Sequence, residues 1–102
     1  MKFKLISVIL FYLFFSCSVN AAIGVLSSVE TETVVYAVGN SICSKDDQYW
    51  NGHNITIITY NPDDSTINYE FGLIVNYEFD NCLIEIDVPL RFARTGSRVR
   101  VY

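Results

Sequence analysis

Residues 66–79, TINYEFGLIVNYEF, alternate between apolar and polar side chains over most of their length. The apolar set occupies the odd-numbered positions: Ile67, Tyr69, Phe71, Leu73, Val75, Tyr77 and Phe79. The even-numbered positions are polar or glycine, apart from Ile74. A period of two predicts a long β-strand whose odd-numbered face lies in a hydrophobic core. Gly72 predicts a bulge or bend in this strand, or its division into two shorter ones.

Further strands are predicted on both sides of this stretch. The β-branched run within 53–60 predicts a strand, and the Asn-Pro-Asp-Asp-Ser turn at 61–65 joins it to the long strand as a hairpin. Alternation after the Asp80-Asn81 turn predicts a strand over 82–88, and 23–29 and 33–38 predict two more. Residues 99–101 alternate with arginines, which predicts an edge strand with an arginine face.

The remaining segments indicate loops. The polar stretch 44–52 predicts a loop, and only 90–95 could form a single helical turn. The fold class is therefore all-β, a small barrel or sandwich of five to seven antiparallel strands in one domain over 22–102.

The first residues have the layout of a secretory signal. Lys2 and Lys4 precede an apolar run over 5–15, and small residues follow it. This pattern predicts a signal peptide over 1–21, cleaved near Ala21/Ala22, and a secreted or periplasmic protein. The run is shorter than the about 20 residues of a spanning helix, so no stable membrane span is expected after cleavage. Cys17, at the end of the run, leaves a lipoprotein as the alternative.

Two cysteines lie in the predicted domain, Cys43 and Cys82. In a small exported domain an even pair predicts one disulfide, which is worth about 4 kcal/mol for a loop of about 40 residues. Free thiols or a metal pair are the alternatives, but neither CxxC spacing nor clustered histidines support them.

The charge is unevenly distributed. Without Lys2 and Lys4, five basic residues face eleven acidic ones, a net charge of −6. An acidic body argues against nucleic-acid binding, which needs a basic face. The basic residues gather near the end of the chain, where Arg94, Arg98 and Arg100 are candidates for binding an acidic cleft in a partner protein.

The sequence contains few residues that could support catalysis. His53 is the only histidine, no nucleophile motif occurs, and the acidic pairs at 46–47 and 63–64 lack the ligand rhythm of a calcium loop. We therefore expect a non-enzymatic protein without a metal or cofactor.

The loop before the 53–60 strand combines aromatic, acidic and amide side chains. Its candidate ligand-binding residues are Asp46, Asp47, Tyr49, Trp50, Asn51 and His53. An aromatic ring beside planar hydrogen-bonding groups suits a sugar or a protein hot spot. Trp50 can equally fold inward to cap a thin core, and the sequence leaves both alternatives open.

Two segments carry a family resemblance: Gly24–Val29, which leads towards Cys43, and Arg91–Tyr102, with its Thr95-Gly96 turn and valine strand. They resemble the small oligonucleotide/oligosaccharide-type barrels of bacterial toxin B subunits, of the subtilase and typhoid types. The resemblance implies an exported, disulfide-bonded, non-catalytic subunit that forms pentamers and binds cell-surface glycans. Those subunits have a helix before the Thr-Gly turn and continue beyond the position of Tyr102, so no binding residue is carried over.

A second resemblance concerns Asn54–Tyr60 and Thr95–Arg98, which are similar to small periplasmic inhibitors of lysozyme. The sequence thus favours an exported binding protein that recognises a glycan or a protein through the 46–53 loop, and that could form a homo-oligomer. The alternative is an inhibitor or immunity-type protein that blocks a partner enzyme through the arginine face.

Overall fold

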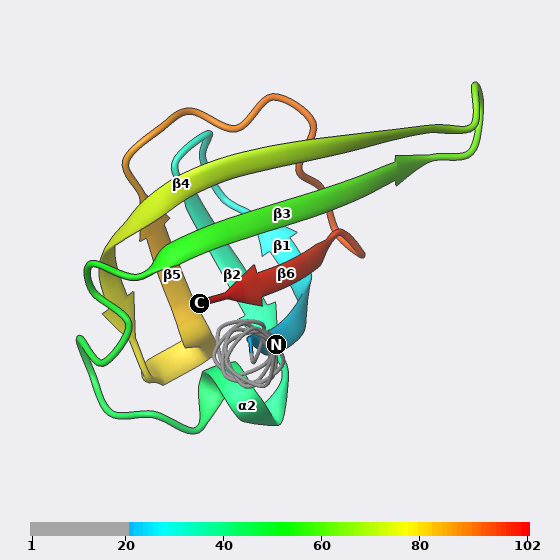
Figure 1. Ribbon diagram of the computed structural model, residues 1–102. Helices are drawn as coiled ribbons and strands as arrows, with labels where there is room; N and C mark the ends of the chain where they lie inside the picture. The colour runs from blue at the N-terminus through cyan, green and yellow to red at the C-terminus, as the bar shows by residue number, and fades with distance from the viewer. Residues whose placement is uncertain (1–20) are drawn as a thin grey trace, which may run out of the picture.

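The computed structural model describes residues 21–102, which form six strands and two short helices (Figure 1). The strands are β1 (Ala22–Val29), β2 (Val34–Val38), β3 (Asn54–Asn61), β4 (Thr66–Glu78), β5 (Leu83–Ile86) and β6 (Arg98–Val101). The helices are α2 (Asn40–Cys43) and the 3-10 helix η1 (Asp80–Cys82). The predicted signal peptide, of which only Ala21 is described, and Cys17 lie outside these residues.

The six strands form a closed antiparallel barrel in the order β1-β2-β5-β4-β3-β6, which confirms the all-β prediction in its barrel form. The barrel closes through β6, which lies between β1 and β3 (Figure 1). Arg100, for example, is opposite Ile23 on one side and Thr56 on the other. The prediction of an edge strand at 99–101 is therefore wrong, because both edges of β6 are paired.

The residues of β4 that face the core are not those that the alternation predicts. Its apolar odd-numbered side chains from Ile67 to Val75 are 43–67% exposed, whereas Ile74 is 1% exposed. A register shift between Ile74 and Asn76 then brings Tyr77 into the core, and Phe79 is again exposed. The predicted core face is thus correct at Tyr77 and wrong at the other six positions.

The even-numbered side of β4 is polar because it faces a loop and not only the barrel core. The Glu70 carboxylate accepts hydrogen bonds from the backbone N–H groups of Arg91 (2.6 Å) and Phe92 (3.1 Å). At Gly72 a Cβ would lie 2.6 Å from Ile86 Cγ2 and 3.1 Å from Val88 Cγ2. Gly72 therefore permits close approach of the 86–88 segment, and the predicted bulge lies two residues later.

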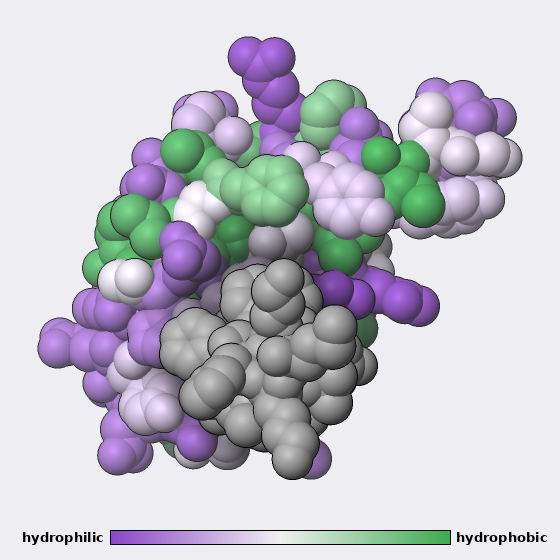
Figure 2. Space-filling view, in the orientation of Figure 1, coloured by the Kyte–Doolittle hydropathy of each residue, from purple (hydrophilic) through white to green (hydrophobic). Residues whose placement is uncertain are grey.

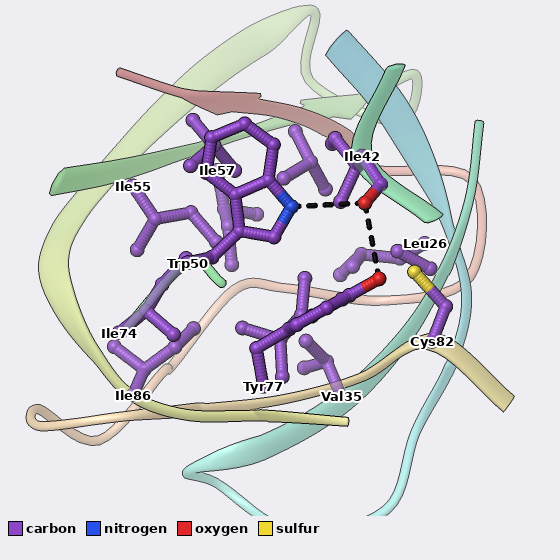
Figure 3. Packing of buried hydrophobic residues seen from close by; sticks show 14 residues of the cluster. Leu26, Val35, Ile42, Trp50, Ile55, Ile57, Ile74, Tyr77, Cys82 and Ile86 are labelled. Carbon is purple, nitrogen blue, oxygen red and sulfur yellow. Dashed lines mark hydrogen bonds between the residues drawn. The ribbon is translucent and has the colours of Figure 1, made fainter. Parts of the chain in front are cut away.

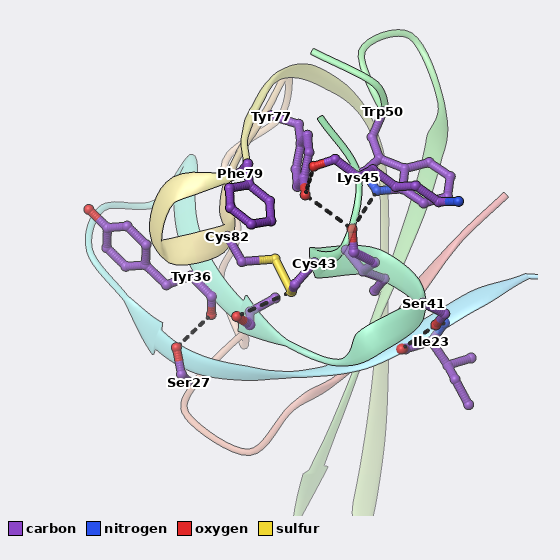
Figure 4. The surroundings of a disulfide bond; sticks show 12 residues. Ile23, Ser27, Tyr36, Ser41, Cys43, Lys45, Trp50, Tyr77, Phe79 and Cys82 are labelled. Carbon is purple, nitrogen blue, oxygen red and sulfur yellow. Dashed lines mark hydrogen bonds between the residues drawn. A yellow bond between two sulfur atoms is a disulfide. The ribbon is translucent and has the colours of Figure 1, made fainter. Parts of the chain in front are cut away.

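A disulfide joins the two short helices at one end of the barrel, as predicted (Figure 4). Cys43 of α2 and Cys82 of η1 have an S–S distance of 2.07 Å. Beside it, Ser41 Oγ accepts a hydrogen bond from the N–H of Ile23 and donates one to its carbonyl, both at 2.9 Å. Helix α2 is thereby fastened to β1 as well as to η1. With four residues, it is too short to show helical periodicity in the sequence. Residues 90–95 contain no helix.

Candidate functional site

The 46–53 loop turns its tryptophan into the barrel. Trp50 is 7% exposed, and its Nε1–H donates to the Ile42 carbonyl at 2.9 Å (Figure 3). The same carbonyl accepts from the Tyr77 hydroxyl at 3.2 Å, and that hydroxyl is also 3.0 Å from the Lys45 carbonyl. Trp50 thus caps the core, which is the inward alternative, and its ring is not available as a plate for a sugar.

The polar residues of the loop hold it to the backbone of β4 and to residues just beyond the ends of β4 and β6. Asp47 Oδ1 accepts from the Phe79 N–H at 2.7 Å, and Asn51 Oδ1 accepts from the Tyr77 N–H at 2.9 Å. The Nδ1 atom of His53 lies 2.6 Å from the Tyr102 carbonyl oxygen. Each of these side chains contacts a backbone group. Their polar atoms therefore fix the shape of the loop and are not free to bind a ligand.

Tyr49 is the aromatic residue that the loop leaves at the surface. Its side chain is 51% exposed and stacks on His53, with ring centroids 6.2 Å apart and planes 17° apart. The Lys45 ammonium lies 5.0 Å from the Tyr49 ring centroid, and Asp46 is exposed next to it. No group of three or more His, Cys, Asp or Glu side chains among residues 21–102 is placed to hold a metal ion.

A second surface covers the outside of β1, β6, β3 and β4, together with the end of β2. We call it the arginine–aromatic face. Its exposed apolar side chains gather over β3 and β4 in Figure 2. The face consists of the exposed Ile23, Val25, Val38, Tyr60, Ile67, Tyr69, Phe71 and Leu73 and the half-buried Ile58, with Arg98 and Arg100 among them.

Strand register places the two arginines in the middle of this face. One row across the strands runs Val25, Arg98, Ile58, Tyr69, and the next runs Ile23, Arg100, Thr56, Phe71. Both arginines are exposed, and the residues directly opposite them on both neighbouring strands are apolar or a threonine. Neither guanidinium therefore has a carboxylate opposite it within the barrel wall.

The arginine–aromatic face is hollowed at three places. A hollow of about 360 Å³ lies between β1, the end of β2 and β6, where Val38, Arg98 and Arg100 line it. A second, also about 360 Å³, is bordered by Tyr60, Ile67 and again Arg98. The third, about 510 Å³, has a lining that includes Asn54, Thr56, Phe71, Leu73, Asp87 and Tyr102. Arg98 thus separates two apolar hollows and borders both.

Of the predicted partner-binding arginines, the structure brings two together. Arg98 and Arg100 share the outer face of β6. Arg94 instead donates from its Nη2 to the Tyr60 carbonyl at 2.5 Å, near the end of the projecting β3–β4 hairpin. Sequence reasoning missed the aromatic part of the face, because the alternation in β4 predicts those side chains to be buried.

The Tyr77 hydroxyl makes the free energy of unfolding depend on pH. Burial, with smaller contributions from Asp47 and Asp46, raises the pKa of Tyr77 above its ordinary value of 10.0. Because the folded state holds the proton more tightly, this group's contribution to stability is complete below pH 10 and falls as the pH rises through the folded-state pKa. We expect the wild type to lose more stability than Tyr77→Phe when the pH is raised above about 10. Urea unfolding of both proteins over this pH range measures the difference, and parallel curves would contradict the prediction.

Tyr77→Phe also provides a test at neutral pH. The change leaves the Lys45 carbonyl without its hydroxyl donor, whereas the Ile42 carbonyl keeps the Trp50 N–H. A loss of about 1–3 kcal/mol in the free energy of unfolding is expected for a part-buried acceptor left unpaired.

Among residues 21–102, no helix has the length and apolar character needed to cross a bilayer. Comparisons of the chain with protein-family models, with curated proteins and with solved structures give no match. The function is therefore inferred from the geometry of this chain.

Proposed function

We propose that the protein is an exported, non-enzymatic binding protein that docks an acidic protein partner on its arginine–aromatic face. The observation that carries this proposal is the position of Arg98 and Arg100, exposed among apolar side chains with no carboxylate opposite them in the adjacent strands. Arginine and aromatic residues are the types most enriched in the energetically important parts of protein interfaces.

Charge indicates the character of the partner. The domain over 22–102 has a net charge of −6, yet this face presents two arginines whose Cα atoms are about 7 Å apart, the spacing of residues i and i+2 on a strand. A partner with carboxylates at matching positions would be oriented by this pair, while the rest of the barrel would repel it. Apolar side chains of the partner would fill the hollows on either side of Arg98.

An enzyme with an acidic cleft would be one partner of this kind. In that case the protein would act as an inhibitor or immunity-type protein and would use the same face. The β3–β4 hairpin projects beyond the barrel and carries Tyr60 and Ile67 near its end (Figure 1). A projecting element of this shape could enter a cleft while Arg98 contacts its rim.

Export is supported by the disulfide and by the sequence of the first 21 residues. The Cys43–Cys82 bond is consistent with an oxidising compartment outside the cytosol. The basic and apolar layout of residues 1–21 supplies the expected signal.

A glycan bound at the 46–53 loop is the second candidate function. The observation in its favour is Tyr49, which is half exposed and lies nearly parallel to His53, with ring centroids 6.2 Å apart, beside Asp46 and Lys45. With Trp50 buried, this plate is a single ring, and binding would depend on Tyr49 and only weakly on salt. Loss of glycan-array binding in Tyr49→Ala, with retention in Arg98→Glu, would identify this function.

The docking proposal is tested by selecting a phage-displayed peptide library on the purified, disulfide-intact protein. We expect enrichment of peptides that combine Asp or Glu with aromatic residues. Arg98→Glu should weaken their binding at least about tenfold, since a charge contact in the interface becomes repulsive. Binding should also weaken between about 0.05 M and 0.5 M salt, as screening increases.

Arg91→Glu is the matched control, because it makes the same charge change at an exposed arginine outside the face. Selected peptides should bind this variant nearly as well as the wild type. Peptides that bind Arg98→Glu and the wild type equally well would overturn the proposal, and so would a selection that yields no acidic sequences.

A further inference from the structure

The outer half of β4 has one edge that no strand covers. On one side, β3 pairs with β4 from Thr66 to Leu73. On the other side, β5 pairs only with the later part, from Ile74 to Glu78. Among residues 21–102, the edge of β4 opposite β3 therefore has no strand partner from Thr66 to Phe71, whereas at Leu73 it is already bonded to Asp87.

The hydrogen bonds at Leu73 show which backbone groups point out of this edge. The Leu73 N–H donates to Asp87 Oδ1 at 2.8 Å, and the Leu73 carbonyl accepts from the Asp87 N–H at 3.0 Å. Backbone groups of alternate residues in a strand point to the same side. The N–H and C=O groups of Ile67, Tyr69 and Phe71 therefore point away from β3, and no residue of the described part of the chain bonds to them.

We propose that this edge binds the same edge of a second copy of the chain. Antiparallel pairing about a two-fold axis at Tyr69 would place Tyr69 opposite Tyr69 and Ile67 opposite Phe71, with six backbone hydrogen bonds between the copies. The three side chains lie on one face of the strand, so the pairing joins aromatic and apolar residues across the axis, an arrangement that stabilises sheets.

Charge favours this arrangement over stacking of the faces. In the two-fold register Glu70 lies opposite Asn68, and no two charged residues oppose each other between Ile67 and Phe71. Arg98 and Arg100 lie two strands away from the edge. Packing two arginine–aromatic faces against each other would instead bring four guanidinium groups together, within copies that each carry −6.

The second edge of the hairpin is blocked, so the pairing closes as a dimer. Strand β6 covers β3 as far as Ile58, and the next outward-pointing carbonyl, that of Tyr60, accepts the Arg94 guanidinium. A charged group at an edge prevents further strand addition. One free edge per copy gives a symmetric pair, whereas two would allow a filament.

The exposed area predicts a weak dimer. Ile67, Tyr69 and Phe71 are 53%, 57% and 67% exposed, which at about 150–250 Å² for an aromatic side chain amounts to roughly 300 Å² of apolar surface per copy. Stable interfaces bury about 800 Å² per partner. The dimer should therefore form only at high protein concentration.

The test follows amide hydrogen exchange of the disulfide-intact protein by NMR at low and at near-millimolar concentration, together with sedimentation. The N–H groups of Asn68 and Glu70 point towards β3 and should be protected at every concentration. Those of Ile67, Tyr69 and Phe71 should exchange freely when dilute and slow at least about tenfold as the sedimenting mass doubles.

Tyr69→Pro is the informative variant, because it removes an outward N–H that the barrel does not use, and proline is accepted at such edge positions. It should abolish the concentration dependence at Ile67 and Phe71. Arg98→Glu should leave the dimer intact, which separates this proposal from the docking of an acidic partner. A protein that remains monomeric at near-millimolar concentration would overturn the proposal, as would a dimer that survives Tyr69→Pro.

Discussion

Trp50→Ala is expected to lower the free energy of unfolding by about 3–5 kcal/mol, the range for removing a buried aromatic side chain. The ring is 7% exposed and closes the end of the core beside Ile42 and Tyr77 (Figure 3). Its loss leaves a cavity and takes one donor from the Ile42 carbonyl. Small domains have only about 5–15 kcal/mol of stability in total, so the variant should lose a large fraction of its stability.

Urea unfolding followed by circular dichroism measures this loss. Tyr49→Ala is the matched control, since it removes the neighbouring, half-exposed aromatic and should cost less than about 1 kcal/mol. Trp50→Phe should fall between the two, because it keeps a ring in the core but loses the N–H donor. If Trp50→Ala cost no more than Tyr49→Ala, Trp50 would not be part of the core.

Removal of the disulfide is the second change with a large expected effect. Replacing Cys43 and Cys82 with alanine should lower the free energy of unfolding by about 4 kcal/mol, the chain-entropy value for residues 39 apart in sequence. The bond also fastens α2 to η1, and Trp50 and Tyr77 both donate to the Ile42 carbonyl in α2 (Figure 4). We therefore expect the capped end of the barrel to loosen first.

Denaturant midpoints of the oxidised, reduced and double-alanine proteins test this expectation. Reduced wild type should resemble the double-alanine variant, because both lack the covalent link. A midpoint that does not change on reduction would show that the cross-link adds nothing to stability.

Local chemistry allowed much of the fold to be predicted. The hairpin, the strands and the disulfide lie where the sequence predicts them. Each is specified by nearby residues: the turn residues at 61–65, the β-branched residues in 55–59 and the two cysteines. The alternation in β4 does not show which of its two faces is covered by the rest of the chain. Glu70 and Gly72 look like surface residues in sequence, but one caps the 91–92 backbone and the other accommodates Ile86.

The candidate site was harder to predict for the same reason. The arginine face of 98–101 could be recognised from its alternation, but its neighbours could not, because closure of the barrel between β1 and β3 is a long-range event. Trp50 was undecided, since burial of its ring depends on the Ile42 carbonyl eight residues away. Tertiary packing, not local sequence preference, decides both features.

The closing position of β6 has a consequence for biosynthesis. Two hairpins, β1–β2 and β3–β4, can form as soon as their own residues emerge from the ribosome, but both β1 and β3 need β6 to complete their hydrogen bonding. The barrel wall therefore stays open until residues 98–101 have been made. Until then the outer edges of β1 and β3 have no strand to pair with, so the nascent chain exposes two unpaired strand edges.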